Sequence, residues 1–372
     1  MTTPRVLFIC GSLNQTTQLH AVARELHDVE AWFSPYYADG FADWLCRSGL
    51  AEGTIGGAKR SRWCLDYLRG HGLSIDVGGR AGGYDLVVTC TDLVMPKNIR
   101  DGKVVVVQEG IFDPDDWVAA LCRRLRWLPR WLAGTALTGE SFAYDVFCAA
   151  SEGYRDRLIE KGVDPNKVVV TGIPNFDDCT KYYQNDFPHR GYVLVCTSDR
   201  RETYASSDRE GFIRYARELA AGRQLIFKLH PNEEAERARG EIEALTPGAL
   251  VFQQGSAEEM IANASALVTE WSSTVFVGIA LGKEVYSYRP LDELLRLCPW
   301  QNGGTSAARI ADVCRDVLGS ERGSSADESG IRATAVPNTG EPQNSGEAQN
   351  SGAPAVRVKR DNVAGRYPPR FA

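Results

Sequence analysis

Several residues suited to phosphate binding follow a short apolar segment in the second half of the chain. Residues 225–227 (Leu-Ile-Phe) have the composition of a buried parallel strand, and they run directly into Lys228 and His230. Ligands of open α/β sheets bind beyond the carboxyl ends of the strands, so we expect both side chains to project into such a crevice. There they would supply positive charge and N–H donors to a phosphate, and His230 is also a candidate catalytic residue. The alternative is that His230 and Pro231 form only a turn.

A second polar group follows residues 266–269 (Ala-Leu-Val-Thr). Glu270, Ser272 and Ser273 stand between this apolar segment and an apolar helical pattern over residues 274–281. Serine is a preferred N-cap residue, and a helix N-terminus carries unpaired N–H groups and a positive dipole end. These features favour a phosphate beside the two serines, with Glu270 as a further nucleotide-binding residue. Serines that only cap the helix are the alternative interpretation.

Two acidic residues follow strand-like segments in the first half of the chain. Asp92 follows residues 84–91, and Glu109 follows residues 104–107 and precedes Gly110. In a parallel sheet both carboxylates reach the same edge, where either is a candidate general base. Gly110 favours Glu109, because a glycine lets a ligand approach closely. The alternatives are that Asp92 caps a turn and that Glu109 is a solvated surface residue.

Two further pairs of residues are candidates for nucleotide binding. Gly11 and Ser12 close a strand-like segment at residues 5–10 and precede a helical pattern, which resembles the start of a nucleotide-binding unit. A tight turn between strand and helix gives the same pattern. Arg200 and Arg201 follow another strand candidate and are suited to bidentate contact with a diphosphate. Pairing of these arginines with neighbouring acidic residues is the alternative.

Nothing in the sequence predicts a metal site or a cofactor. Asp113, Asp115 and Asp116 have the spacing of acidic metal ligands, but they stand where a helix begins, and acidic residues are expected there for dipole reasons. The ten cysteines are scattered without a Cys-x-x-Cys pair. Scattered cysteines within apolar segments indicate free thiols in a reducing, cytoplasmic setting.

Length and composition exclude several classes of protein. The chain has 372 residues, of which 43% are hydrophobic and 24% charged, so it is long enough for two globular domains. Its net charge of −6 gives no overall attraction to nucleic acid, and we expect no nucleic-acid partner. No apolar run approaches the roughly 20 residues of a membrane span, and the apolar stretch near the N-terminus is too short for a signal peptide.

Strand and helix patterns alternate along the chain, which predicts an α/β fold of two Rossmann-like domains facing a central cleft. We expect an acceptor-side domain over residues 1–181 and a donor-binding domain over residues 182–318. Residues 319–372 are dominated by small and polar types, which predicts a disordered tail. The strand candidates are residues 5–10, 29–37, 84–91, 104–107, 145–149, 168–170, 192–197, 225–227, 250–253, 266–269 and 285–288.

Residues 116–132 form a basic, tryptophan-rich amphipathic pattern. Trp117 and four leucines recur at helical spacing, three arginines fall on the opposite face, and Pro129 is expected to kink the helix. Such a helix either covers a sheet or lies on an anionic membrane surface. The second interpretation predicts peripheral contact with the inner face of a membrane.

The chain resembles the nucleotide-sugar glycosyltransferases of the two-Rossmann type (GT-B). Within that superfamily it is similar to the CDP-glycerol glycerophosphotransferases and to the non-hydrolysing UDP-N-acetylglucosamine 2-epimerases. The resemblance covers residues 5–318 and is carried by four matches. They are residues 172–177 (Gly-Ile-Pro-Asn-Phe-Asp), residues 227–231 (Phe-Lys-Leu-His-Pro), residues 269–273 (Thr-Glu-Trp-Ser-Ser) followed by residues 280–283 (Ala-Leu-Gly-Lys), and residues 199–203 (Asp-Arg-Arg-Glu-Thr).

The sequence also departs from both families. The glycerophosphotransferases carry a His-Gly pair that serves as base, whereas Glu109-Gly110 stands here, and the histidine of the epimerases' Arg-Arg-Glu segment is Asp199. The resemblance implies transfer of a sugar or polyol phosphate from a UDP- or CDP-linked donor to a hydroxyl of a glycan or lipid-linked glycan, in surface polysaccharide or glycoconjugate synthesis. An epimerase acting on a UDP-sugar, or a nucleotide-binding module without catalysis, are the alternatives.

Overall fold

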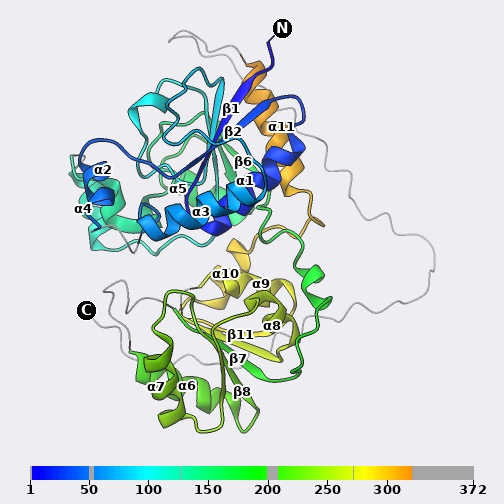
Figure 1. The fold of residues 1–372 in the computed structure, drawn as a ribbon. Helices are drawn as coiled ribbons and strands as arrows, with labels where there is room; N and C mark the ends of the chain where they lie inside the picture. Colours follow the sequence, from blue (N-terminus) through cyan, green and yellow to red (C-terminus); the bar gives the residue numbers. More distant parts are fainter. Residues whose placement is uncertain (1, 50–53, 126, 199–207, 271, 321–372) are drawn as a thin grey trace. The chain divides into compact units, whose positions relative to one another are not determined.

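The structure is a computed structural model that describes residues 2–49, 54–125, 127–198, 208–270 and 272–320 (Figure 1). Met1–Ser320 form one compact unit. The predicted tail from residue 321 onward, and the predicted diphosphate contacts Arg200 and Arg201, lie outside the described residues.

The first sheet has six parallel strands in the order β2-β1-β3-β4-β5-β6. Such a sheet has crevices where successive connections leave in opposite directions, here between β1 and β3. The strands are β1 (Arg5–Cys10), β2 (Glu30–Pro35), β3 (Leu86–Thr89), β4 (Val104–Val107), β5 (Val146–Ala149) and β6 (Val168–Val170).

The second sheet has five parallel strands in the order β11-β10-β7-β8-β9. The connections that leave its strands change direction between β7 and β10, so its crevice lies there. The strands are β7 (Val193–Cys196), β8 (Leu225–Lys228), β9 (Leu250–Phe252), β10 (Ala266–Thr269) and β11 (Glu284–Tyr286). The predicted α/β fold of two parallel sheets is confirmed.

Alternation along the strands divides the hydrophobic core between the two faces of each sheet. In β1, Val6 and Phe8 pack in a cluster with α1, α3 and α11, whereas Leu7 and Ile9 belong to a second cluster. That second cluster also contains Leu194 of β7, so apolar contacts run continuously from one sheet to the other. The helices are α1 (Leu13–Glu25), α2 (Gly40–Arg47), α3 (Ala58–Gly70), α4 (Trp117–Arg124), α5 (Glu152–Glu160), α6 (Arg209–Ala220), α7 (Ala235–Leu245), α8 (Ala257–Asn263), α9 (Thr274–Ala280), α10 (Leu291–Leu297) and α11 (Ser306–Gly319).

Helix α11 packs on the first sheet, although it follows the second sheet in sequence (Figure 1). Ile310 and Cys314 of α11 are fully buried against Val105 and Cys148 of β4 and β5. The chain therefore crosses from the first sheet to the second and back again. The predicted donor-binding domain ran to residue 318, but its last helix shares the core of the first sheet; the boundary at residues 181 and 182 stays a prediction.

The predicted helix over residues 116–132 is interrupted. Helix α4 ends at Arg124, and a 3₁₀ segment follows at Arg130–Leu137, because Pro129 has no N–H to continue an α-helix. Of the expected stripe, Trp117 is 76% exposed, Leu121 38% and Leu132 46%, and Leu128 packs against a small buried cluster, so most of the stripe does not face the core. Contact of this segment with a membrane stays a prediction. No helix within the described ranges is long and apolar enough to cross a bilayer.

Candidate active site

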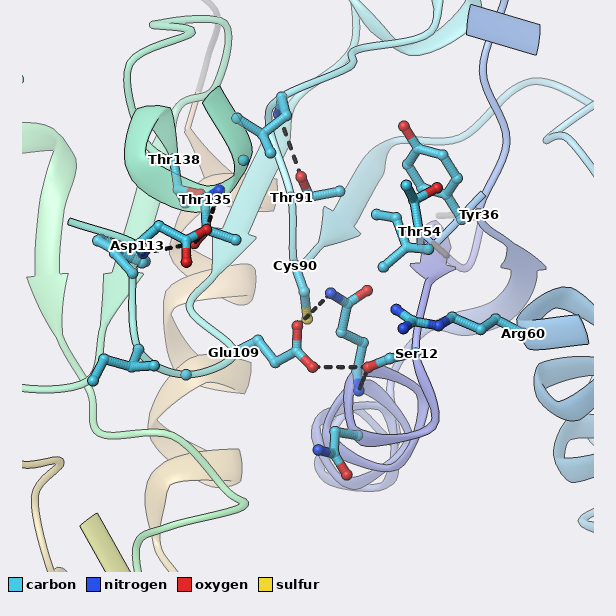
Figure 2. A pocket seen from close by; sticks show the side chains of 18 of the residues that line it. Ser12, Tyr36, Thr54, Arg60, Cys90, Thr91, Glu109, Asp113, Thr135 and Thr138 are labelled. Atoms are coloured by element: carbon cyan, nitrogen blue, oxygen red, sulfur yellow. Dashed lines mark hydrogen bonds between the residues drawn. The ribbon is translucent and has the colours of Figure 1, made fainter. Parts of the chain in front are cut away.

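A cavity of about 780 Å³ is lined by residues that follow strands of both sheets (Figure 2). Five of the residues predicted for the site lie in its lining: Ser12, Glu109, His230, Ser272 and Ser273. The first two follow β1 and β4, and the others follow β8 and β10. The two parallel sheets thus bring together side chains that are more than 250 residues apart in the sequence.

Glu109 is held by two hydrogen bonds from the start of α1. Ser12 Oγ donates to Glu109 Oε1 at 2.8 Å, and Gln15 Nε2 donates to Glu109 Oε2 at 2.5 Å. Ser12 is also the N-cap of α1, because its hydroxyl accepts the N–H of Gln15. These contacts fix the carboxylate toward the cavity, with its remaining lone pairs available to a substrate proton.

The predicted residue Gly11 leaves space for the side chain of Gln15, and its contact with a nucleotide stays a prediction. A Cβ at Gly11 would lie 2.0 Å from Gln15 Oε1, so only glycine leaves room for that amide to reach Glu109. Gln15 is 4% exposed and was not identified from the sequence. The sequence signal that could have identified Gln15 is its position three residues after the helix cap Ser12, on the helix face that turns toward the sheet.

His230 is positioned by the turn that follows β8. Its backbone N–H donates to Thr197 Oγ1 at 3.1 Å and to Glu233 Oε2 at 2.8 Å. Its ring Nδ1 accepts the N–H of Asn232 at 3.3 Å, so a neutral ring carries its proton on Nε2. His230 is also among the residues that line the cavity.

The two serines after β10 lie in the cavity lining, but their hydrogen bonds differ from the prediction. Ser273 is the N-cap of α9 and makes no side-chain capping bond. Ser272 Oγ instead accepts the N–H of Thr274 at 3.3 Å and the hydroxyl of Thr274 at 3.0 Å. Ser273 Cβ lies 3.5 Å from the position that a Cβ on Gly110 would occupy, so the serine faces the loop after β4.

Lys228 lies apart from the residues that line the cavity. Its side chain is 7% exposed, and its Nζ donates to the backbone carbonyls of Leu229 at 3.2 Å and of Gln253 at 2.9 Å. Among the described residues, the cavity lining does not include it. Burial lowers the pKa of Lys228. The ammonium therefore ties the ends of β8 and β9 together, and the contact of Lys228 with a diphosphate stays a prediction.

Asp92 lies in the interior of the first sheet's loops. The residue is fully buried, and its carboxylate oxygens accept the backbone N–H groups of Gly139 and Ser141, each at 2.9 Å. It is absent from the cavity lining formed by the described residues. These contacts are the ones that the turn-capping alternative describes, and the role of Asp92 as a general base stays a prediction.

Glu270 is 2% exposed and lies behind the cavity lining. Its Oε2 accepts a hydrogen bond from Ser198 Oγ at 2.6 Å, and Ser198 lines the cavity. The pair joins the ends of β7 and β10, at the reversal point of the second sheet. Glu270 thus orients a lining residue in the part of the chain that the structure describes.

The acidic segment after β4 is used in structural contacts. Asp113 Oδ2 accepts the N–H of Thr135 at 3.0 Å and its hydroxyl at 2.7 Å, and both residues line the cavity. Asp116 caps α4 by accepting the N–H of Ala119 at 2.8 Å. No cluster of three or more potential metal ligands occurs within the described residues.

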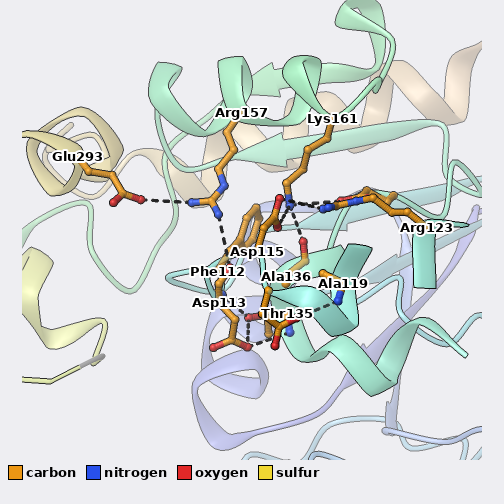
Figure 3. Close-up of polar contacts among 12 residues, drawn as sticks. Phe112, Asp113, Asp115, Ala119, Arg123, Thr135, Ala136, Arg157, Lys161 and Glu293 are labelled. Carbon is orange, nitrogen blue, oxygen red and sulfur yellow. Dashed lines mark hydrogen bonds and ion pairs between the residues drawn. The ribbon is translucent and has the colours of Figure 1, made fainter. Parts of the chain in front are cut away.

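A buried ion cluster holds the same segment against α5 (Figure 3). Arg123 contacts both carboxylate oxygens of Glu140, at 2.7 Å and 2.8 Å, and Asp115 at 3.1 Å. Lys161 lies 3.3 Å from Asp115 and 3.3 Å from Glu140. Glu140 and Lys161 have side chains that are each only 8% exposed, so loss of either one would leave a buried charge without its partner. Arg123 is already paired within the cluster.

Three other features of the lining were not identified from the sequence. Arg60 of α3 reaches the cavity, and helix α2 contributes Ala42, Leu45 and Cys46. Cys90 also lines the cavity, and burial raises the pKa of its thiol well above the ordinary value. A neutral thiol is a poor nucleophile, so Cys90 contributes shape rather than chemistry.

Comparison with solved structures identifies the fold. An S. aureus MnaA–UDP co-structure matches 85% of this chain and 97% of its own, with a TM-score of 0.54 and 12% identity. The UDP-GlcNAc 2-epimerase of Neisseria meningitidis bound to UDP-GlcNAc matches 84% of this chain and 100% of its own, with a TM-score of 0.52 and 13% identity. The UDP-GlcNAc 2-epimerase of Methanocaldococcus jannaschii in complex with UDP-GlcNAc and UDP matches 84% of this chain and 99% of its own. The TM-score is 0.50 and the sequence identity 12%.

No family model and no curated protein matches the sequence. At 12–13% identity the structural matches establish the fold alone. The predicted similarity to the two-Rossmann superfamily is confirmed at that level. The chain has a GT-B-like fold of two parallel α/β sheets.

Proposed function

We propose that the chain is a transferase that binds a UDP- or CDP-linked donor and moves its sugar or polyol phosphate to an acceptor hydroxyl. The acceptor is a glycan or lipid-linked glycan, which places the reaction in surface polysaccharide or glycoconjugate synthesis. The observation that carries the proposal is Glu109, a carboxylate held by Ser12 and Gln15 in a cavity shared by both sheets.

The donor contacts come from the second sheet. His230 presents an N–H donor, and the hydroxyl groups of Ser272 and Ser273 lie in the same lining. Hydrogen-bond donors near a diphosphate stabilise the charge that develops as the nucleotide leaves. The GT-B-like fold supports this assignment, because the Neisseria enzyme of the same fold is bound to UDP-GlcNAc.

In the chemical step, Glu109 acts on the acceptor as the general base. Its carboxylate accepts the proton of the acceptor hydroxyl as the oxygen attacks the anomeric carbon or the phosphorus of the donor. The bond between that atom and the nucleotide's phosphate oxygen breaks, and the nucleotide leaves with the electron pair. The leaving group is a nucleoside diphosphate for sugar transfer and a nucleoside monophosphate for transfer of a polyol phosphate.

The first test compares nucleotide binding with turnover in Glu109→Gln. Binding of UDP and CDP is measured by calorimetry, and turnover by nucleotide release from UDP- and CDP-linked donors with lipid-linked and free glycan acceptors. We expect nucleotide affinity to stay within about twofold and turnover to fall by roughly 10²- to 10⁴-fold, as for loss of a general base.

A matched control is Glu25→Gln, the same change at an exposed residue at the end of α1. It is expected to leave both measurements unchanged. Turnover in Glu109→Gln equal to that of the wild type would remove Glu109 as base. Binding of UDP or CDP without any turnover would favour a nucleotide-binding module without catalysis.

The fold supports a second candidate, epimerisation of a UDP-sugar, because two of the matched structures are UDP-GlcNAc 2-epimerases. The two reactions differ in their requirement for an acceptor. An epimerase converts UDP-GlcNAc to its 2-epimer without an acceptor. A transferase releases nucleotide only when an acceptor hydroxyl is present. Epimer formation in the absence of acceptor decides for the second candidate.

A further inference from the structure

Arg289 is a buried cation that connects the second sheet to the first. It stands between β11 and α10 and is 5% exposed. Its Nη2 donates to the backbone carbonyl of Phe112, in the loop after β4, and its Nη1 lies 3.5 Å from Glu293 Oε1. A guanidinium taken out of water needs such partners, and its planar fork can hold two of them at once.

The same carboxylate oxygen of Glu293 holds a second arginine. Arg157 Nη1 of α5 lies 3.5 Å from Glu293 Oε1, and Arg157 Nη2 donates to the carbonyl of Asp113 at 3.5 Å (Figure 3). Two successive carbonyls of the loop therefore accept hydrogen bonds from two arginines that share one carboxylate. Arg289 is the more deeply buried of the two arginines and the one that comes from the second sheet.

The loop held by these arginines carries the proposed base. Glu109 precedes it directly, and residues 110–113 all line the cavity. Ser12 and Gln15 fix the carboxylate of Glu109, but the backbone that follows it is fixed by the contact of Phe112 with Arg289. The separation between this loop and the second sheet therefore depends on Arg289.

On the second sheet, hydrogen bonds lead from Arg289 back to the cavity. Ser287 Oγ accepts the N–H of Arg289 at 3.4 Å and donates to the carbonyl of Glu270 at 2.9 Å. The carboxylate of Glu270 accepts the hydroxyl of Ser198 at 2.6 Å, and Ser198 lines the cavity beside the proposed donor contacts. A chain of hydrogen bonds through Glu270 thus joins the donor side of the cavity to the loop of the base.

We propose that Arg289 is a positioning residue that couples donor binding to the placement of Glu109. A donor that orders the ends of β7 and β10 favours, through Arg289, the loop position in which the carboxylate reaches the acceptor hydroxyl. Coupling of this kind is reciprocal, so the acceptor raises the affinity for the donor by the same factor. The inference rests on the proposed function and names the regulation of its site.

The first experiment measures deuterium exchange of the amides of residues 110–113, with and without saturating UDP or CDP. In wild type we expect bound nucleotide to slow this exchange about threefold or more. Arg289→Lys keeps the charge but replaces the planar fork with a single point donor. We expect this variant to bind nucleotide within about twofold of wild type, as measured by calorimetry, and its loop exchange not to respond to the nucleotide.

The second experiment measures turnover of the same variant. Arg289→Lys is expected to lower kcat by roughly 10- to 100-fold and to leave the KM of the donor within about twofold, because only the placement of the base changes. In a Glu109→Gln background the same substitution is expected to have no further effect, since Arg289 acts through Glu109. A residue that only stabilises the fold would lower the active fraction equally in both backgrounds.

Glu293→Gln is a second variant that leaves Arg289 in place. It removes the carboxylate shared by the two arginines, and it is expected to change loop exchange and kcat in the same direction as Arg289→Lys. Asp292→Asn is the matched control, because Asp292 is an exposed acidic residue in the same turn of α10. We expect it to behave as wild type. Equal effects of Glu293→Gln and Asp292→Asn would overturn the proposal, since general charge alone would then explain both.

The outcomes separate this inference from the proposed function. If neither UDP nor CDP binds the wild-type protein, both fail. If nucleotide binds but Glu109→Gln keeps full turnover, the assignment of the base fails, and loss of the exchange response in Arg289→Lys still supports coupling between the sheets. If nucleotide binds without slowing loop exchange in wild type, or slows it equally in Arg289→Lys, the coupling fails alone.

Discussion

Replacing Gly153 with alanine tests the closest backbone approach between the helices of the two sheets. Gly153 is buried in the first turn of α5, and a Cβ there would lie 2.2 Å from the backbone oxygen of Arg296 in α10. Two hydrogen bonds to backbone carbonyl oxygens lie at the same interface. Ser151 Oγ donates to the carbonyl of Leu297 at 3.1 Å, and the N–H of Trp300 donates to the carbonyl of Ala150 at 3.0 Å.

The expected decrease in the free energy of unfolding follows from that distance. Ordinary contact with a Cβ begins at 3.4 Å, so α5 and α10 must separate by roughly 1.2 Å to accept the methyl group. The clashing atom belongs to the backbone, so no side-chain rotation relieves it. Overpacking of this kind costs about 1–3 kcal/mol. The gain in helix propensity on replacing glycine, at most about 1 kcal/mol and smaller in a first turn, offsets part of it.

The assay is urea unfolding of the full chain, with Gly240→Ala as the control. Gly240 lies within α7, and a Cβ there meets nothing within 4 Å, so the same substitution is expected to stabilise by about 0.5–1 kcal/mol. We expect Gly153→Ala to unfold at lower urea than wild type, and the two variants to differ by about 2–3 kcal/mol. Gly153→Ala with wild-type stability would refute the close contact between α5 and α10.

Three further outcomes are expected. Gly11→Ala displaces Gln15 from Glu109 and lowers turnover by roughly 10- to 100-fold, as for loss of a hydrogen bond to a charge, and it has no further effect in a Gln15→Ala background. Lys228→Met lowers the urea-unfolding free energy by about 1–3 kcal/mol but leaves UDP affinity within twofold, because its ammonium binds two backbone carbonyls. For Asp76, burial raises the pKa, but hydrogen bonds from Tyr84, Ala81 and Arg80 outweigh it and lower the pKa below its ordinary 3.8. Stability from the ionised form is therefore present above pH 3.8 and lost as pH falls, so the difference in unfolding free energy between wild type and Asp76→Asn should close below about pH 4.

The sheets were predictable from the sequence because their strands are buried on both faces. Such strands read as continuous apolar runs, and β1, β4, β6 and β10 have the predicted bounds to the residue. Polar residues at the carboxyl ends then indicated where ligands bind. That rule placed Ser12, Glu109 and His230 in one cavity.

The rule could not tell which polar side chains face the cavity and which face the protein. Lys228 and Asp92 also stand at strand ends, but backbone groups of neighbouring loops surround them. Those partners are set by tertiary packing: Gly139 is 47 residues from Asp92, and Gln253 is 25 residues from Lys228. Local sequence carries no record of such contacts. Arg60 was missed for the same reason, because nothing near it in the sequence marks a cavity.

The return of α11 to the first sheet has a mechanical consequence. Two separate segments, residues 171–192 and residues 298–305, join the sheets, so a cut at either one leaves the halves still connected by the other. A fragment ending at residue 181 would expose the apolar faces of Val105 and Phe8 that α11 and α1 enclose together. Because two segments connect the sheets, any rotation of one sheet relative to the other has to change the backbone conformation of both segments.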